Sequence, residues 1–111
     1  MVVQRWSDDV LVVDLSDDPE LSDDMADVSD ALRGECCDVV LNLAGLRLLT
    51  SSGISKLLRL RKRMLENSRR MVLCAPQDRV WGVFLATGLD GLFEFVPSVA
   101  EALARLQTGK A

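Results

Sequence analysis

Short apolar runs alternate with helical patterns along this sequence, and that alternation constrains its fold more than any other feature. Val10-Leu11-Val12-Val13 is continuous and mostly β-branched, which is typical of a strand covered on both faces. Other short runs between turn-forming residues also predict strands. The expected strands cover residues 2–6, 10–15, 38–43, 71–75 and 92–96.

Apolar residues recur at helical spacing in the segments between and after these strands. The first helix is expected from Asp18-Pro19, a pair that favours a helix start, to about Gly34, a plausible stop. Its apolar face would consist of Leu21, Met25, Val28 and Leu32. The later helices are expected from the Thr50–Gly53 cluster to about Glu66, from Arg79 to about Thr87 before Gly88, and from the Ser98–Glu101 capping box through Leu106.

The helix that ends near Glu66 combines a buried stripe with a basic face. We expect Ile54, Leu57, Leu58 and Leu65 to be buried, and Lys56, Arg59 and Arg63 to face outward.

The resulting order is β-β-α-β-α-β-α-β-α. Strands that alternate with helices imply a largely parallel sheet joined by right-handed crossovers. With 111 residues, the chain has room for one domain. The sequence therefore predicts a single α/β domain over residues 1–111, with a mixed, mostly parallel sheet of four to five strands and about four helices.

The residue types exclude several kinds of chemistry. The chain contains no histidine, the usual general base and the commonest metal ligand, so a Ser-His-Asp hydrolase is excluded. Cys36, Cys37 and Cys74 form no C-x-x-C motif, and their odd number argues against a disulfide framework. No phosphate-binding glycine motif or metal cluster is present either. We expect no enzymatic activity, no cofactor and no metal.

Charge is distributed unevenly along the chain. Residues 1–38 contain 12 acidic and two basic residues, whereas residues 39–75 contain eight basic residues and one acidic residue. Such a dipolar chain can use charge to select or orient a partner. The basic residues also raise the alternative of nucleic-acid binding, which we set aside because they lack nearby aromatic residues. This basic set is Lys56, Arg59, Lys62, Arg63, Arg69 and Arg70.

The most informative segment joins the central strand to the basic helix. Thr50-Ser51-Ser52-Gly53 brings three hydroxyl groups to a helix N-terminus, where free backbone N–H groups and the helix dipole favour an anion. The simplest interpretation is structural, with Ser51 or Ser52 capping the helix. Trp6, Trp81, Phe84, Phe93 and Phe95 are interpreted as packing residues.

The run from Leu43 to Leu58 resembles the STAS domain of bacterial anti-sigma factor antagonists. The C-terminal half, with Pro76, Thr87-Gly88-Leu89, Phe93 and the Glu101-Ala102 helix, follows the same family pattern. In that family a serine of the D-S-S-G turn is phosphorylated by a partner that is both kinase and anti-sigma factor. Phosphorylation blocks binding, and a phosphatase restores it.

The resemblance implies that Ser51 is the phosphorylated residue. It also implies a partner-binding surface, on which Leu49 and Ile54 would offer apolar side chains. The full expected surface is Asn42, Leu49, Thr50, Ser51, Ser52, Gly53 and Ile54.

The sequence departs from the family pattern at two positions. Thr50 stands where many members have an aspartate, and Asn42 replaces the strand aspartate. These differences favour an alternative role as a non-phosphorylated STAS adaptor in a multiprotein or lipid-transport complex.

The expected partners are an anti-sigma factor with serine kinase activity and a phosphatase. Nucleic acid and direct membrane insertion are not expected. The apolar runs are far shorter than the ~20 residues of a membrane span, and no signal peptide is recognisable, so we expect a cytoplasmic protein. The sequence leaves the oligomeric state open.

Overall fold

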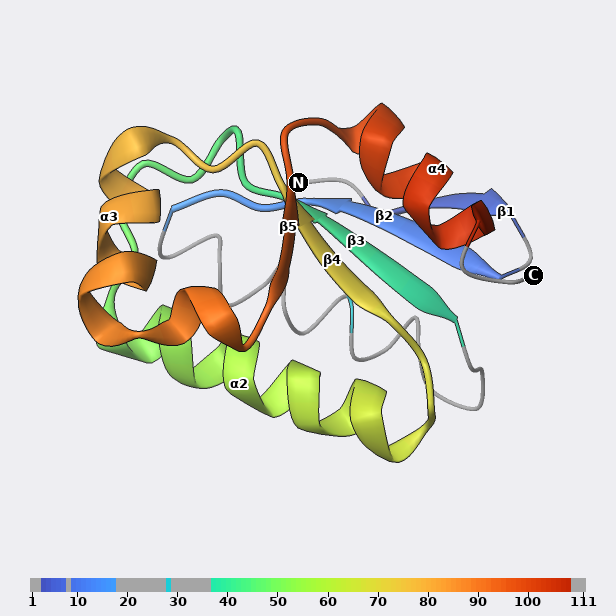
Figure 1. Ribbon diagram of the computed structural model, residues 1–111, viewed down its shortest axis with the longest axis horizontal. Coiled ribbons are helices and arrows are strands. Elements are labelled where there is room, and N and C mark those ends of the chain that lie inside the picture. Colours follow the sequence, from blue (N-terminus) through green and yellow to red (C-terminus); the bar gives the residue numbers. More distant parts are fainter. Residues whose placement is uncertain (1–2, 8, 18–27, 29–36, 109–111) are drawn as a thin grey trace.

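The computed structural model describes residues 3–7, 9–17, 28 and 37–108. Its sheet has the order β1-β2-β3-β4-β5 (Figure 1). The strands are β1 (Val3–Ser7), β2 (Val10–Asp14), β3 (Asp38–Asn42), β4 (Met71–Cys74) and β5 (Glu94–Val96). Strand β1 is antiparallel to β2, and the remaining neighbours are parallel. The predicted mixed, mostly parallel α/β fold is therefore confirmed.

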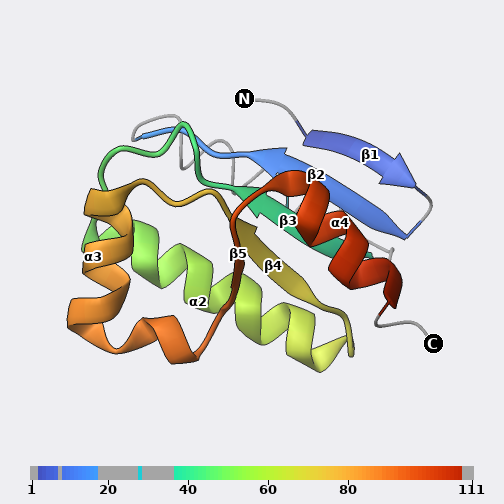
Figure 2. The same ribbon diagram turned by 45° about the horizontal axis from the view of Figure 1, so that its top comes forward.

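Helices cover both faces of this sheet. The described helices are α2 (Ser51–Glu66), α3 (Asp78–Thr87), α4 (Val99–Thr108) and a short 3-10 helix, η1 (Leu89–Gly91). Helices α2 and α3 lie on one side of the sheet and α4 lies on the other (Figures 1 and 2). The helix predicted over residues 18–34 lies outside the described residues, except for Val28, which is buried.

The continuous apolar run in β2 explains why both faces need a cover. Leu11 and Val13 belong to the core on the α2 and α3 side, whereas Val10 and Val12 belong to the core beneath α4. All four side chains are buried, as the sequence predicted. Alternation along a strand sends neighbouring residues to opposite faces, so one run supplies both cores.

Helix α2 buries a different stripe from the one expected. Its buried residues are Gly53, Leu57, Leu60 and Met64, at intervals of four, three and four. The predicted members Leu58 and Leu65 are instead 36% and 58% exposed, and Ile54 is partly buried. Leucines at both 57 and 58 allowed two helical phases, and packing of Leu60 and Met64 against the sheet selects the observed one.

Two arginines of the six-residue basic set are held by carboxylates at the start of the parallel strands. The Nε atom of Arg69 lies 3.1 Å from Asp38 Oδ1, an ion pair whose N–H is not aligned for a hydrogen bond. Arg70 forms an ion pair with Glu94. Of the other basic residues, Arg59 and Lys62 are exposed, while Lys56 and Arg63 are partly buried. The six basic residues therefore do not form one free surface.

The C-terminal half follows the predicted elements closely. Gly88 ends α3 with a left-handed φ of 74°, and the Ser98 hydroxyl accepts a hydrogen bond from the Glu101 N–H at 3.2 Å. Phe84 is fully buried and contacts Phe95 edge-on, with ring centroids 4.9 Å apart. The last strand begins at Glu94 rather than Leu92, because Leu92 caps η1 and its N–H donates a hydrogen bond to the Leu89 carbonyl.

Candidate functional site at the start of helix α2

The candidate site lies at the edge of the sheet where the parallel strands end. Asp14 ends β2, Asn42 ends β3, and residues 43–50 lead from there to the first turn of α2. The same loop runs beside the start of α3 (Figure 2). In α/β proteins this edge commonly carries the binding site, because loops and helix N-termini converge there.

Asn42 joins two parts of this edge through both ends of its side-chain amide. Its Nδ2 group donates a hydrogen bond to Asp14 Oδ1 at 2.9 Å, and its Oδ1 atom accepts one from the Ala44 N–H at 3.1 Å. A carboxylate at this position would accept but not donate. Asn42 therefore fixes the exit of β3 and is suited to a neighbouring Asp14 carboxylate.

Asp17 organises the next part of the loop. One carboxylate oxygen accepts hydrogen bonds from the N–H groups of Arg47 at 2.7 Å and Leu48 at 3.1 Å, and the other accepts from Arg47 Nε at 3.0 Å. The backbone and side-chain hydrogen bonds from Arg47 hold the pKa of Asp17 below its usual value. The Arg47 side chain nevertheless stays 80% exposed.

The hydroxyl cluster divides into a capping residue and exposed residues. Thr50 is the N-cap of α2, and its Oγ1 atom accepts a hydrogen bond from the Gly53 N–H at 3.1 Å. The expectation that Ser51 or Ser52 caps the helix is therefore wrong. Ser51 and Ser52 are exposed, and the Ser52 hydroxyl accepts a hydrogen bond from Lys56 Nζ at 2.6 Å.

Ser51 is the first residue of α2, and no hydrogen bond engages its hydroxyl within the part of the chain that the structure describes. The first turn of α2 contains no acidic side chain. A group attached to Ser51 would therefore meet the positive end of a 16-residue helix.

Leu49 does not offer its side chain at the surface, contrary to expectation. It is only 6% exposed and belongs to the core on the α2 side of the sheet. Leu46 is also buried, whereas Leu48 is 55% exposed. The sequence did not indicate Leu48, because the leucines around Arg47 (Leu46, Leu48 and Leu49) follow neither helical nor strand periodicity. Ile54 is partly buried, and Gly53 is buried beneath the turn.

A hollow of about 630 Å³ adjoins the loop and the start of α3. It is lined by Arg47, Gln77, Asp78 and Arg79. Gln77 ties its two sides together, because Gln77 Nε2 donates a hydrogen bond to the Ala44 carbonyl at 2.6 Å. The hollow extends the candidate surface beyond the residues that the sequence indicated.

The remaining candidate groups are structural. Cys37 and Cys74 are buried cysteines, and Cys36 lies outside the described residues. Burial raises the pKa of Cys74 to about 11, and the negative charge of Asp14 adds to this effect. The described residues contain no cluster of three or more residues suited to hold a metal ion. None of the described helices is long and apolar enough to cross a membrane.

The family model of the STAS domain matches residues 2–102, which is most of the chain. The chain belongs to the STAS domain family. The resemblance seen in the sequence is thereby confirmed.

Solved structures have the same fold as this STAS domain. An anti-sigma-factor antagonist (STAS) domain protein from Planctomyces limnophilus superposes with a TM-score of 0.83 at 22% identity, covering 96% of this chain and 97% of that one. The anti-sigma factor antagonist SpoIIAA in its unphosphorylated form gives 0.82 at 20% identity, covering 96% of each chain. The Bacillus cell fate determinant SpoIIAA in its phosphorylated form gives 0.73 at 21% identity, covering 94% of this chain and 96% of that one.

Proposed function

We propose that this STAS domain is a protein-binding regulator of the anti-sigma factor antagonist type, and that phosphorylation of Ser51 switches its partner binding. One observation carries the proposal. Ser51 is an exposed hydroxyl residue at the first position of α2, and its neighbour Thr50 caps the helix in its place. Modification of Ser51 therefore leaves the cap intact.

The helix end can accept the added charge in the free protein. A phosphate group brings about −1.5 to −2 charges and three acceptor oxygens. At Ser51 it would lie at the positive end of the α2 dipole, in a turn without acidic side chains. Lys56, which already reaches Ser52, adds a cation one turn away. The fold need not change on modification.

A partner surface packed against the same turn would respond differently. It would have to bury a dianion without matching charges, which is strongly unfavourable. Converting a complex from about 99% to about 1% formed requires a change of about 10⁴-fold in binding. Burial of the phosphate against a partner surface that lacks matching positive charges would supply a change in affinity of this size.

The proposed docking surface centres on the exposed part of this turn. Ser51, Ser52, Leu48 and Arg47 are exposed there, and Ile54 is partly exposed. The other predicted site residues support this surface from beneath. Thr50 caps the helix, Gly53 and Leu49 are buried, and Asn42 fixes the exit of β3.

The proposed partner is an anti-sigma factor that is also a serine kinase, with a phosphatase restoring the unmodified form. Membership of the STAS domain family and the fold shared with SpoIIAA support this type of partner. The solved structures of SpoIIAA include both an unphosphorylated and a phosphorylated form. In this role the chain needs no catalytic group of its own, and we expect it to act in the cytoplasm.

The test uses a purified anti-sigma factor kinase from the native cell. We expect ATP-dependent addition of one phosphate to the wild-type chain and to Ser52→Ala, and none to Ser51→Ala. Ser51→Asp should weaken kinase binding strongly, whereas Ser51→Ala should bind as the wild type does. Equal binding of wild type, phosphorylated wild type and Ser51→Asp would refute the switch.

A second candidate function is favoured by Asn42 and Thr50, which replace aspartates of the family pattern. A non-phosphorylated STAS adaptor would dock through the same surface without modification. The two proposals differ in the mass of the Ser51 peptide from native cells. A peptide without phosphate under all growth conditions favours the adaptor.

A further inference from the structure

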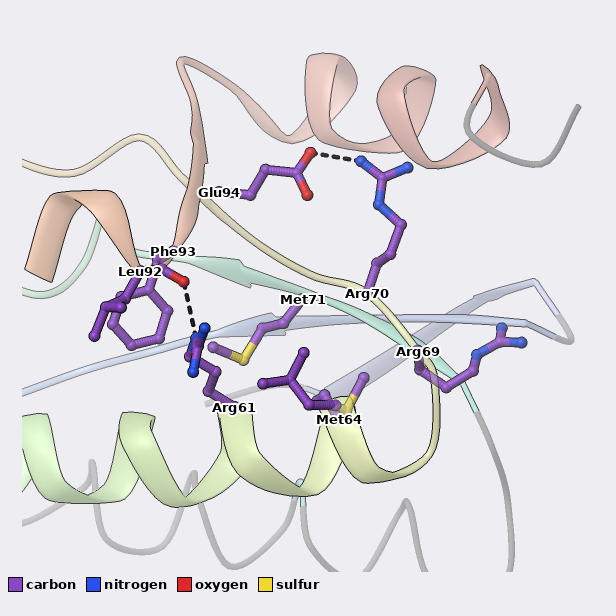
Figure 3. Close-up of a pocket in the computed structure, with 9 residues that line it drawn as sticks. Arg61, Met64, Arg69, Arg70, Met71, Leu92, Phe93 and Glu94 are labelled. Atoms are coloured by element: carbon purple, nitrogen blue, oxygen red, sulfur yellow. Dashed lines mark hydrogen bonds and ion pairs between the residues drawn. The ribbon is translucent and has the colours of Figure 1, made fainter.

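A second hollow, of about 190 Å³, adjoins the end of α2 opposite to Ser51. Figure 3 shows the residues that line it. It is bounded by the C-terminal half of α2 and by the residues where β4 and β5 begin. Its lining combines arginines with apolar side chains: Arg61, Met64, Leu65, Arg69, Arg70, Met71, Leu92, Phe93 and Glu94.

Two of the three arginines are already neutralised. Arg69 is paired with Asp38, and Arg70 is paired with Glu94. Glu94 Oε2 also lies 3.4 Å from Arg105 Nη1, so this carboxylate faces two cations. The charges of Arg69 and Arg70 are therefore committed to holding the strands and α4 in place.

Arg61 differs from these two arginines, because no carboxylate among the described residues forms an ion pair with it. Its Nε group donates a hydrogen bond to the Leu92 carbonyl at 2.9 Å, which anchors the guanidinium beside Leu92 and Phe93 (Figure 3). This bond leaves the two Nη groups as a fixed pair of donors. Such a pair matches two oxygen atoms of a carboxylate or a phosphate.

The rest of the lining is apolar and partly open to water. Met64, Met71 and Phe93 are buried and form the walls. Leu65 and Leu92 also line the hollow and are 58% and 45% exposed. A ligand that covers these two leucines would remove apolar surface from water, which favours binding.

We propose that this hollow binds a small anion that carries a short apolar chain, either a carboxylate or a phosphate monoester. Arg61 binds the anionic group, and Leu65 and Leu92 contact the chain. This site is separate from the turn at Ser51 and does not rest on the proposed switch.

The wild-type protein is titrated with four probes while amide chemical shifts are followed by NMR. Hexanoate and hexyl phosphate distinguish the two anionic groups, and shifts of residues around Arg61 and Leu92 are expected with one or both. Acetate should bind more weakly because it lacks the chain, and hexylammonium should not bind because its charge is reversed. Hexylammonium binding as tightly as the anions, acetate binding as tightly as hexanoate, or no shifts with any probe would overturn the proposal.

Matched substitutions on α2 then assign the anion contact. Arg61→Gln keeps a polar side chain but removes the charge, and it should weaken binding of the anionic probes by about tenfold or more. Arg59→Gln removes an exposed charge from the same helix and should leave binding unchanged. Equal binding by Arg61→Gln and the wild type, or equal losses in both variants, would contradict the assignment to Arg61. Circular dichroism establishes that each variant is folded.

Discussion

The Oγ1 atom of Thr50 accepts a hydrogen bond from the Gly53 N–H at 3.1 Å, so the threonine and neither serine caps helix α2. Within these four consecutive residues, the residue that stabilises the helix start is therefore different from the residues that are exposed. Thr50 satisfies a backbone donor that would otherwise lack a partner, while Ser51 and Ser52 face solvent.

The cap predicts a clear order among hydroxyl substitutions. Thr50→Ala should lower the free energy of unfolding by about 1 kcal/mol, because the Gly53 N–H loses its acceptor. Thr50→Ser and Thr50→Asp should retain most of the stability, since both side chains are good N-caps. Urea denaturation measures these differences. Ser51→Ala is the control and should change little, so a loss as large as that of Thr50→Ala would contradict the assignment.

The hydrogen bond between Asn42 and Asp14 leads to a prediction about negative charge at the end of β3. Asn42→Asp would replace the donor that lies 2.9 Å from Asp14 Oδ1 with a second carboxylate. We expect this variant to be less stable than the wild type at neutral pH, because two adjacent negative charges repel. The deficit should shrink as the salt concentration is raised, because dissolved ions screen the repulsion between exposed charges. Asn42→Ser, which introduces no charge, is the control. A deficit for Asn42→Asp that is independent of salt concentration would show that repulsion is not the cause.

The sequence was sufficient to predict the fold, because its local patterns agree with the burial and backbone conformations that the structure shows. The β-branched run of β2 lies buried between two cores, and Gly88 takes the left-handed conformation that ends a helix. Where two phases of a pattern were possible, the sequence was not decisive. Leu57 and Leu58 are adjacent, and only packing against the sheet shows that Leu57 is inside.

The details of the candidate site depended on contacts between distant residues. Asp17 fixes the backbone at Arg47 and Leu48 through hydrogen bonds across 30 and 31 residues of sequence. No local pattern reports such a contact, and it accompanies the burial of Leu49 and the exposure of Leu48. The sequence also did not show which hydroxyl residue is the N-cap of α2, because Ser and Thr are both acceptable N-caps.

Substitution by alanine is expected to change the stability in opposite directions at two glycines, Gly82 within α3 and Gly88 at its C-terminal end. Gly88 has a φ of 74°, and Gly88→Ala should destabilise the protein by about 1 kcal/mol, because alanine disfavours the left-handed region. Gly82 lies within α3, and an added Cβ there would meet nothing within 4 Å. Gly82→Ala should therefore stabilise the protein by up to about 1 kcal/mol. Thermal unfolding of the pair checks this, and shifts of the same sign would contradict it.

The buried thiol of Cys74 leads to a prediction about the stability of the protein at alkaline pH. Its thiol is buried and lies 3.6 Å from the Leu41 carbonyl, and burial raises its pKa to about 11 from a usual value of 9.0. Between these values the folded state keeps the proton while the unfolded state loses it. The unfolded state then binds fewer protons, so the contribution of Cys74 to stability falls as pH rises from about 9 to about 11.

Urea denaturation across this pH range measures the effect, with Cys74→Ala as the matched variant. Cys74→Ala has no group to titrate, so its stability should decline less steeply with pH than that of the wild type. Parallel curves would show that the thiol does not titrate differently in the two states. The same burial predicts that iodoacetamide modifies Cys74 only when urea unfolds the chain, because alkylation requires an accessible thiolate. Rapid modification of Cys74 in the native protein would contradict this.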